Sequence, residues 1–138
     1  MKSYVLDEQG KEYIVQFAPE DWIISDMDSL LNDVLSSVFI ETIEDSEVIL
    51  LSNIGTNPLN DAPREVLMDG IQKFQKNIIS LNKRIIHLLS STAEKRYLDF
   101  METYPTLYQR LPLKLIALYL GITPEFLSRI RKNLAEKR

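Results

Sequence analysis

The feature that most constrains this chain is the run Leu113 to Leu134, in which small, glycine and apolar residues have the spacing of two short helices joined by a tight turn. Ala117 is small enough for the second helix to cross close above the first. Gly121 can supply the positive φ that ends a helix in such a turn. Thr123 can cap the next helix, and Pro124 suits its first position. The run therefore predicts a helix-turn-helix corner.

The second helix of this corner has two chemically different faces. Apolar residues at helical spacing form the inward face: Phe126, Leu127, Ile130 and Leu134. Polar and charged residues share the opposite face: Glu125, Ser128, Arg129 and Lys132. We expect this polar face to be a surface that reads DNA, and the alternative is a plain corner of an all-α fold.

At these residues the chain resembles the Crp/Fnr family of bacterial transcription regulators. The recognition helix of that family commonly carries Glu-x-x-Ser-Arg, which here is Glu125-Phe126-Leu127-Ser128-Arg129. The segment from Ala93 to Leu120 is similar to the family's connecting helices, and the similarity is weaker before Ala93. The resemblance implies an α+β regulator that binds double-stranded DNA.

The resemblance also implies a role for each polar residue of the corner. Arg129 would donate to guanine and Glu125 would accept from a cytosine amino group, which are pairings that the chemistry of the major groove favours. Thr123, Ser128 and Lys132 would contact the DNA backbone, which positions a protein without specifying sequence.

Charge is divided unequally along the chain. Residues 1–62 carry Lys2 and Lys11 against thirteen acidic residues, a net charge of −11, whereas residues 63–138 carry fourteen basic residues against seven acidic ones, a net charge of +7. An acidic half is repelled by phosphates, and a basic half is attracted to them. We therefore expect the C-terminal half to face DNA. The alternative is that acidic loops simply keep a small domain dissolved.

The first half of the sequence contains short apolar segments separated by turn formers. Tyr4 to Leu6 and Glu12 to Phe17 flank a glycine-containing turn, the pattern of a β-hairpin. Further strands are expected at Val38 to Ile43, Glu47 to Leu51 and Trp22 to Ser25, and a short helix at Asp26 to Asp33. The stretch from Asn53 to Pro63 is rich in turn formers and predicts the link to a helical half.

A long helix is expected to begin near Pro63 or Arg64, and its apolar residues repeat every seven positions. Isoleucines occupy heptad position a (Ile71, Ile78 and Ile85), and leucine or phenylalanine occupies position d (Leu67, Phe74, Leu81 and Leu88). This pattern favours a parallel two-stranded coiled coil, so we expect a homodimer that binds an inverted repeat with half-sites roughly 34 to 36 Å apart. Ile79 and Ile86 widen the apolar surface toward the β-rich half. The alternative is a core helix of a monomer.

Further helical segments are expected after the long helix. Ser91 with Glu94 has a capping-box pattern that starts a helix ending near Thr103, with a hinge at Ser90 and Ser91. Three aromatic residues at helical spacing, Tyr97, Phe100 and Tyr104, are expected in the core rather than in a base-stacking platform. Thr106 to Arg110 is expected to form a short irregular or helical turn between two prolines.

The resemblance implies a regulatory β-roll before the dimerisation helix, which in cyclic-nucleotide binders supplies a Gly-Glu pair and a buried arginine. Here no glycine lies between Gly10 and Gly55, and no arginine precedes Arg64. A buried phosphodiester needs hydrogen-bond donors and a cation, so we expect no cyclic-nucleotide binding, and the effector is unknown. The segment is similar to the second half of a roll, which indicates a truncated reading frame, a fragment or a degenerate sensor.

Several other classes of site are disfavoured by composition. The chain has no cysteine, so it has no disulfide, thiolate zinc site or Cys-ligated iron–sulfur cluster. His87 is its only histidine and falls at a c position, where we expect it to face solvent. No nucleophile and base are paired, so we predict neither an enzyme nor a cofactor. Asp26 and Asp28 fit a hard-cation site, but Ser25 and Asp28 equally fit a helix N-cap. With no bilayer-spanning run or signal peptide, a cytoplasmic location is the default.

Together these observations predict an α+β chain with a partial N-terminal antiparallel β-roll (1–62), a dimerisation helix (63–90) and a helix-turn-helix DNA-binding domain (91–138). The expected function is that of a sequence-specific transcription regulator of the Crp/Fnr type, which binds palindromic DNA as a homodimer without cyclic nucleotide. One alternative is a truncated regulator that acts as a protein-interaction module by dimerising with full-length relatives. Another is a sensor whose apolar pocket binds a non-phosphorylated small molecule.

Overall fold

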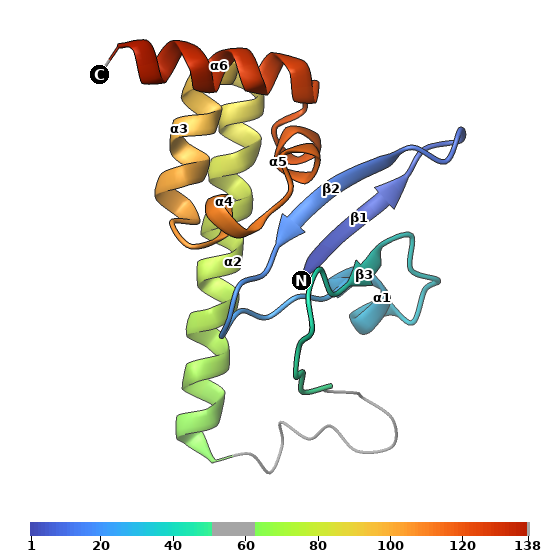
Figure 1. Cartoon of the computed structure of the whole chain (residues 1–138). Coiled ribbons are helices and arrows are strands. Elements are labelled where there is room, and N and C mark those ends of the chain that lie inside the picture. The colour runs from blue at the N-terminus through green and yellow to red at the C-terminus, as the bar shows by residue number, and fades with distance from the viewer. Residues whose placement is uncertain (51–62, 138) are drawn as a thin grey trace.

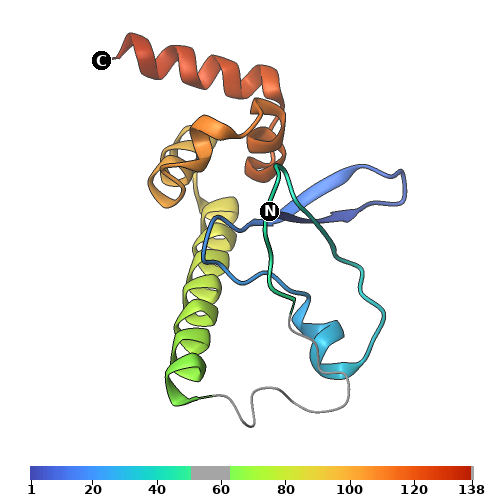
Figure 2. The same ribbon diagram turned by 60° about the horizontal axis from the view of Figure 1, so that its bottom comes forward.

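The computed structural model describes residues 1–50 and 63–137 as a mixed α+β chain that is mostly helical. The described elements are β1 (Lys2–Leu6), β2 (Glu12–Phe17), α1 (Met27–Asn32), β3 (Phe39–Glu41), α2 (Arg64–Ser90), α3 (Ala93–Thr103), α4 (Leu107–Arg110), α5 (Leu113–Leu120) and α6 (Pro124–Glu136). The small sheet and α1 lie to one side of the long helix α2 (Figure 1). The helix α6 lies at the end of the molecule where α2 finishes, far from the start of α2 (Figures 1 and 2).

The β1–β2 hairpin forms as predicted. The Asp7 carboxylate accepts hydrogen bonds from the amides of Gln9 and Lys11, and Gly10 has φ +77°. A side chain that bonds to the backbone of its own turn fixes the loop, and glycine tolerates the left-handed conformation that the loop needs. The hairpin tip points away from the helices (Figure 1).

The hairpin contains a β-bulge in β2. Ser3 pairs with Gln16 and Tyr4 pairs with Ile14, so Val15 is an extra residue with no partner in β1. A bulge interrupts the ladder and redirects the backbone groups beside it. The sheet order is β2-β1-β3, so the bulge lies in an edge strand.

The rest of the first half agrees only partly with the sequence-based prediction. The strand expected at Val38 to Ile43 forms over Phe39–Glu41, and the short helix expected at Asp26 to Asp33 forms as α1. The strands expected at Glu47 to Leu51 and at Trp22 to Ser25 are wrong for the residues that the structure describes, because none of those residues pairs with a neighbouring strand. The described half is therefore a three-stranded antiparallel sheet with one short helix.

The helices begin and end close to their predicted limits. One difference is the start of α3, where Thr92 rather than Ser91 is the N-cap and accepts a hydrogen bond from the Lys95 amide at 3.2 Å. The cap is displaced by one residue because the Ser91 amide still donates to the carbonyl of His87 and so completes the end of α2.

The hydrophobic core of the described residues is built from both halves of the chain. Phe17 of β2 is 0 % exposed, and its ring lies 5.1 to 6.3 Å from the rings of Phe100, Tyr104 and Tyr119. Aromatic rings at these separations attract one another beyond the effect of burial alone. The prediction that Tyr97, Phe100 and Tyr104 are core residues is confirmed, since all three are buried.

Candidate nucleic-acid interface

The turn between α5 and α6 is closed by main-chain hydrogen bonds at Gly121. Gly121 has φ +68°, a conformation that glycine adopts without the steric cost of a Cβ. The amides of Gly121 and Ile122 donate back to the carbonyls of Leu118 and Ala117, at 3.3 and 3.0 Å. Such a pair of bonds ends a helix and satisfies carbonyls that would otherwise lack partners. The turn predicted at Gly121 is confirmed.

The start of α6 is also set by local chemistry. The Thr123 hydroxyl oxygen accepts a hydrogen bond from the Phe126 amide at 3.2 Å, and Pro124 occupies the first turn, where its missing amide hydrogen costs nothing. Because the cap fixes where the helix begins, it also fixes which residues of α6 face outward.

The inward face of α6 packs on α5. Leu127 and Ile130 are 0 % and 5 % exposed and belong to the same buried cluster as Ala117 of α5, which is itself 0 % exposed. A larger side chain in place of Ala117 would separate the two helices. The fold therefore buries the centre of the predicted apolar face, whereas the expectation that Phe126 faces inward is wrong, since Phe126 is 40 % exposed at the edge of that face.

The predicted DNA-contacting residues all lie on the exposed side of the corner: Thr123, Glu125, Ser128, Arg129 and Lys132. The guanidinium carbon of Arg129 lies 5.2 Å from the centroid of the Phe126 ring, and the Lys132 amine lies 3.9 Å from the Glu136 carboxylate. Contacts of this kind at exposed sites are weak. Both cationic side chains can therefore leave them for a stronger partner such as DNA.

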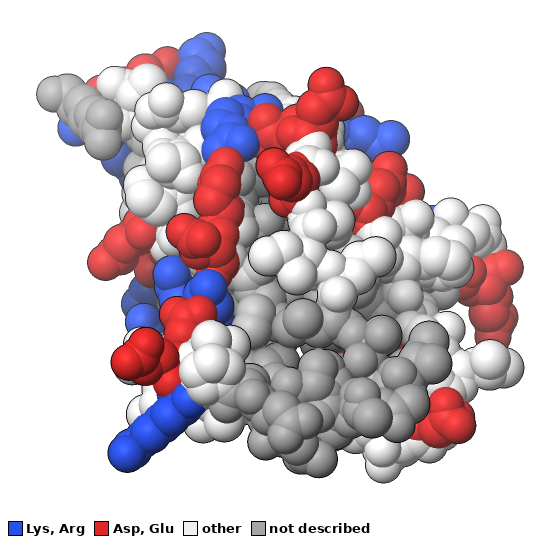
Figure 3. Space-filling view, turned by 90° about the horizontal axis from the view of Figure 1, so that it is seen from below, with Lys and Arg blue, Asp and Glu red and all other residues white. Residues whose placement is uncertain are grey.

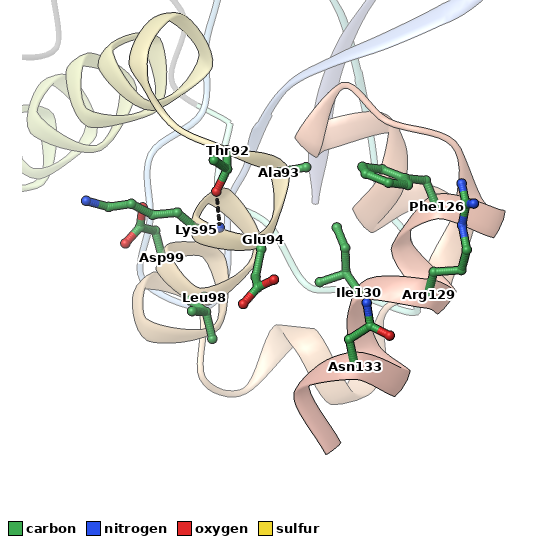
Figure 4. A pocket seen from close by; sticks show the side chains of 10 residues that line it. All are labelled: Thr92, Ala93, Glu94, Lys95, Leu98, Asp99, Phe126, Arg129, Ile130 and Asn133. Atoms are coloured by element: carbon green, nitrogen blue, oxygen red, sulfur yellow. Dashed lines mark hydrogen bonds between the residues drawn. The ribbon is translucent and has the colours of Figure 1, made fainter. Parts of the chain in front are cut away.

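A groove separates α6 from the first half of α3 (Figure 4). Leu98 and Glu94 line it on the α3 side, whereas Phe126, Arg129 and Ile130 line it on the α6 side. In Figure 4 the side chain of Arg129 lies beside the ring of Phe126. Arg129 therefore stands at the border between this groove and the outward face of α6.

The predicted dimer residues of α2 divide into two groups. The a-position isoleucines and Leu88 are exposed, with Ile78 at 58 %, whereas Leu67, Phe74 and Leu81 are partly covered by their own chain. Other exposed apolar residues widen the stripe: Met68, Ile79, Ile86 and Leu89. The expectation that Ile79 and Ile86 extend the apolar surface toward the β-rich half is therefore wrong, because both face away from it. The outward face of α2 is thus a long apolar surface.

The face of α2 that points toward its own chain is mixed in character. Asn77 is 8 % exposed and donates to the carbonyl of Ile23, and Arg84 and His87 lie on the same side, together with the partly covered d-position residues named above. A helix in a monomer normally buries its apolar stripe and leaves its polar side to water. Here much of the apolar stripe is exposed, and polar side chains are among those that the chain covers.

Sequence reasoning missed two arginines that hold the end of α5. Arg84 of α2 donates to the carbonyl of Tyr119, and Arg96 of α3 donates to the carbonyl of Leu120 at 3.2 Å. Burial lowers the pKa of Arg84, but arginine remains protonated in proteins. The sequence carries no signal for the role of Arg84, because a charged residue is usual at the g position that Arg84 occupies beside the seam of a coiled coil.

The expectation that His87 faces solvent is wrong. Its Nδ1 lies 3.0 Å from the Asp99 carboxylate of α3, and the two side chains are only 29 % and 25 % exposed. The reason is that α3 folds back beside the end of α2 after Ser91, which a helical wheel of α2 alone does not reveal.

Several charged groups of the sheet half bind within the fold. The Lys2 amine lies 2.9 Å from the Glu12 carboxylate and 3.3 Å from that of Glu41. The Asp26 carboxylate caps α1 by accepting from the amides of Asp28 and Ser29, so the N-cap is Asp26 rather than Ser25 or Asp28. Residues 1–50 and 63–137 contain no group of three or more metal-ligating side chains.

The charged side chains of one face of the molecule can be followed in Figure 3. Lysine and arginine side chains lie toward its left and upper edges, where acidic side chains are interspersed among them, whereas the charged side chains at the lower right are acidic (Figure 3). Basic and acidic side chains are therefore mixed over most of this face.

Comparisons with protein-family models, with curated proteins and with solved structures found no match to this chain. The resemblance to Crp/Fnr regulators therefore rests on the residues quoted above. Within the part of the chain that the structure describes, no helix has the length and apolar character needed to cross a membrane.

Proposed function

We propose that this protein is a sequence-specific DNA-binding transcription regulator of the Crp/Fnr type, which acts as a homodimer without cyclic nucleotide. The observation that carries the proposal is the outward face of α6. Glu125 and Arg129 stand one turn apart on it, and both are exposed at the end of a capped helix. A guanidinium and a carboxylate in this arrangement can bind the edges of bases in the major groove.

The fold supports this proposal by presenting α6 as a rigid element. The helix is anchored by Leu127 and Ile130, and its start is fixed by Thr123. A reading helix must be held in one orientation, since bidentate contacts to bases tolerate little displacement. Ser128 and Lys132 lie on the same exposed side, where they can contact phosphates.

The experiment that tests this function is selection of bound sequences from a random pool of duplex DNA, followed by titration of the enriched site. We expect an enriched inverted repeat. Arg129→Ala should weaken binding to that site by about 1 to 3 kcal/mol and flatten discrimination at one base pair. Arg131→Ala is the matched control, because Arg131 is an exposed arginine of the same helix outside the predicted reading set.

Two results of that experiment would count against the proposal. One is a pool without an enriched sequence, and the other is equal loss of affinity for specific and random DNA in the Arg129 variant. Salt dependence gives a further check, because a protein that contacts several phosphates loses affinity steeply as salt rises.

The homodimer is supported by the exposed apolar stripe of α2. Ile71, Ile78 and Ile85 are 49 %, 58 % and 55 % exposed. A second copy of α2 would cover this stripe and pair two α6 helices about a two-fold axis.

Sedimentation equilibrium tests this association. Ile78→Asp should convert a dimer into a monomer, because it places a charge in the apolar contact. Leu35→Asp is the matched control, since Leu35 is 100 % exposed on the sheet half and the change in chemistry is the same. A monomeric wild-type protein at tens of micromolar would refute the dimer, and heterodimers without DNA binding would favour the protein-interaction module instead.

A further inference from the structure

We propose that Arg84 is a positioning residue that fixes the α5–α6 corner relative to α2, and that it thereby sets which half-site spacing the proposed dimer accepts. This inference rests on the proposed function and adds a residue outside the DNA-contacting face. It starts from three hydrogen bonds that one side chain makes to main-chain carbonyls at two separate places, the bulge of β2 and the end of α5.

The guanidinium of Arg84 joins α2, β2 and α5. Its Nη1 donates to the carbonyl of Val15 at 2.8 Å, and its Nη2 donates to the carbonyls of Ile14 and Tyr119 at 2.7 and 2.9 Å. The same guanidinium stacks over the Tyr119 ring, with its central carbon 4.3 Å from the ring centroid. The acceptors lie 35 to 70 residues from Arg84 along the chain. One side chain of the long helix therefore ties the sheet to the first helix of the corner.

The bulge in β2 supplies two of these acceptors. Neighbouring carbonyls of a regular strand point to opposite edges, but Val15 is the unpaired residue of the bulge, and its carbonyl and that of Ile14 both bind Arg84. The arginine guanidinium is planar and carries several N–H donors, so it can bind such a pair of carbonyl oxygens at once. A lysine ammonium cannot bind them in the same way, because it is a compact point charge without that geometry.

The end of α5 supplies the third acceptor. The turn at Gly121 satisfies the carbonyls of Ala117 and Leu118, which leaves those of Tyr119 and Leu120 for Arg84 and Arg96. The C-terminal end of a helix carries partial negative charge, which favours cations at this place. The last turn of α5 is thus held from α2 by one arginine and from α3 by the other.

The position of α6 follows from this anchor. Only Gly121, Ile122 and Thr123 separate α5 from α6, and the buried face of α6 packs on α5. In the proposed dimer the two α2 helices meet along the two-fold axis, so the separation of the α6 helices depends on how each corner is fixed to its own α2. The separation of recognition helices is what selects the spacing of half-sites. Loosening Arg84 should therefore relax spacing selectivity and leave the reading of each half-site intact.

The first test measures DNA affinity as a function of spacing. Arg84→Met and Arg84→Lys are titrated with the selected inverted repeat, with versions a base pair or two longer or shorter, and with a single half-site. Lys83→Met is the matched control, because it removes an exposed positive charge from the neighbouring position of the same helix. Folding of each variant is checked by circular dichroism.

We expect both Arg84 variants to keep the half-site affinity of the wild type and to lose about tenfold of its discrimination between spacings, the change expected when a charge-assisted hydrogen bond is lost. The Lys83 variant should match the wild type in both measurements. An unchanged spacing profile in folded Arg84→Met would overturn the inference. The inference would also be overturned if the Arg84 variants bound every DNA, the single half-site included, more weakly by the same factor. Such a result would mean that the substitution only damages the fold.

The second test needs neither DNA nor dimerisation. The chain has no cysteine, so cysteines placed at Asn82 of α2 and Ser128 of α6 can carry one pair of spin labels, with labelled chains diluted in unlabelled protein. We expect a narrow distance distribution with Arg84 present and a broad one with Arg84→Met. An unchanged distribution would overturn the positioning role. If the distribution broadens while the wild type selects no DNA sequence, the proposed function fails and the anchoring role of Arg84 stands.

Discussion

Substitution of alanine for glycine at two places should change stability in opposite directions, which isolates the backbone conformation of the α5–α6 turn. A Cβ at Gly121 would meet the Cδ2 of Leu88 at 3.8 Å, an ordinary van der Waals contact, so space is not the obstacle. The obstacle is φ +68°, where an L-residue costs roughly 1 to 2 kcal/mol. Gly121→Ala should therefore lower the free energy of unfolding by about that amount.

The matched substitution is Gly70→Ala within α2. A Cβ at Gly70 would meet nothing within 4 Å, and Gly70 lies inside a long helix without a positive φ. Alanine in a helix interior is favoured over glycine by roughly 0.8 to 1 kcal/mol, so this variant should be more stable than the wild type. The two variants should then differ by about 2 to 3 kcal/mol in the free energy of unfolding.

Urea unfolding followed by circular dichroism measures both variants at one protein concentration, because association would otherwise add to the apparent stability. Gly121→Asn is a useful third variant, since asparagine tolerates the left-handed region better than alanine and should fall between Gly121→Ala and the wild type. If Gly121→Ala proved as stable as Gly70→Ala, the turn would not depend on a left-handed residue, and the account of the corner would be refuted.

Two other predictions concern the core and the cap of α1. Leu127→Ala should cost roughly 2 to 5 kcal/mol of unfolding free energy, because the side chain is fully buried and leaves a cavity, and a thermal melt that is unchanged would contradict this packing. The Ser36 hydroxyl donates to the Asp26 carboxylate and holds the pKa of that group below its usual value of 3.8. A carboxyl whose pKa is lowered in the folded state stabilises that state above its unfolded pKa and stops doing so as pH falls through its folded pKa. The Ser29 amide resonance should therefore titrate with its midpoint below pH 3.8, and it should lose that response in Asp26→Asn, whereas a response retained in that variant would assign the titration to another group.

The α5–α6 corner was predictable because every one of its features is local. Gly121 has a positive φ, Thr123 caps the start of α6, and Leu127 faces inward. Each of these features depends only on residues a few positions away in the sequence. The hairpin at Gly10 was predictable for the same reason. Short-range chemistry fixes both, so one sequence suffices to locate them.

Features that depend on distant parts of the chain were not predictable. Arg84 binds the carbonyls of both Ile14 and Val15 at the bulge of β2, and alternation of apolar residues does not show where an extra residue is inserted. The heptads of α2 revealed an apolar stripe, but periodicity does not state which side of a helix faces its own sheet. The partner of His87 depends on the way α3 folds back, which the sequence around His87 does not encode.

Strand prediction failed where an apolar run has no neighbour to pair with. Val48, Ile49 and Leu50 have the composition of a strand, yet they are exposed at 46 %, 89 % and 88 % and form none. A strand is stabilised by hydrogen bonds to an adjacent strand and not by its own residues alone. In the described residues no strand pairs with the outer edge of β3, so this run forms no ladder.

Placing Phe17 of β2 against Phe100, Tyr104 and Tyr119 has a practical consequence for dissecting this protein. A truncated chain that begins at α2 would lose the ring around which those aromatic side chains assemble, and would expose them to solvent. Expression of the helical half by itself is therefore expected to give aggregates rather than a minimal reader of DNA. Engineers seeking a smaller version would do better to keep the hairpin and shorten the chain elsewhere.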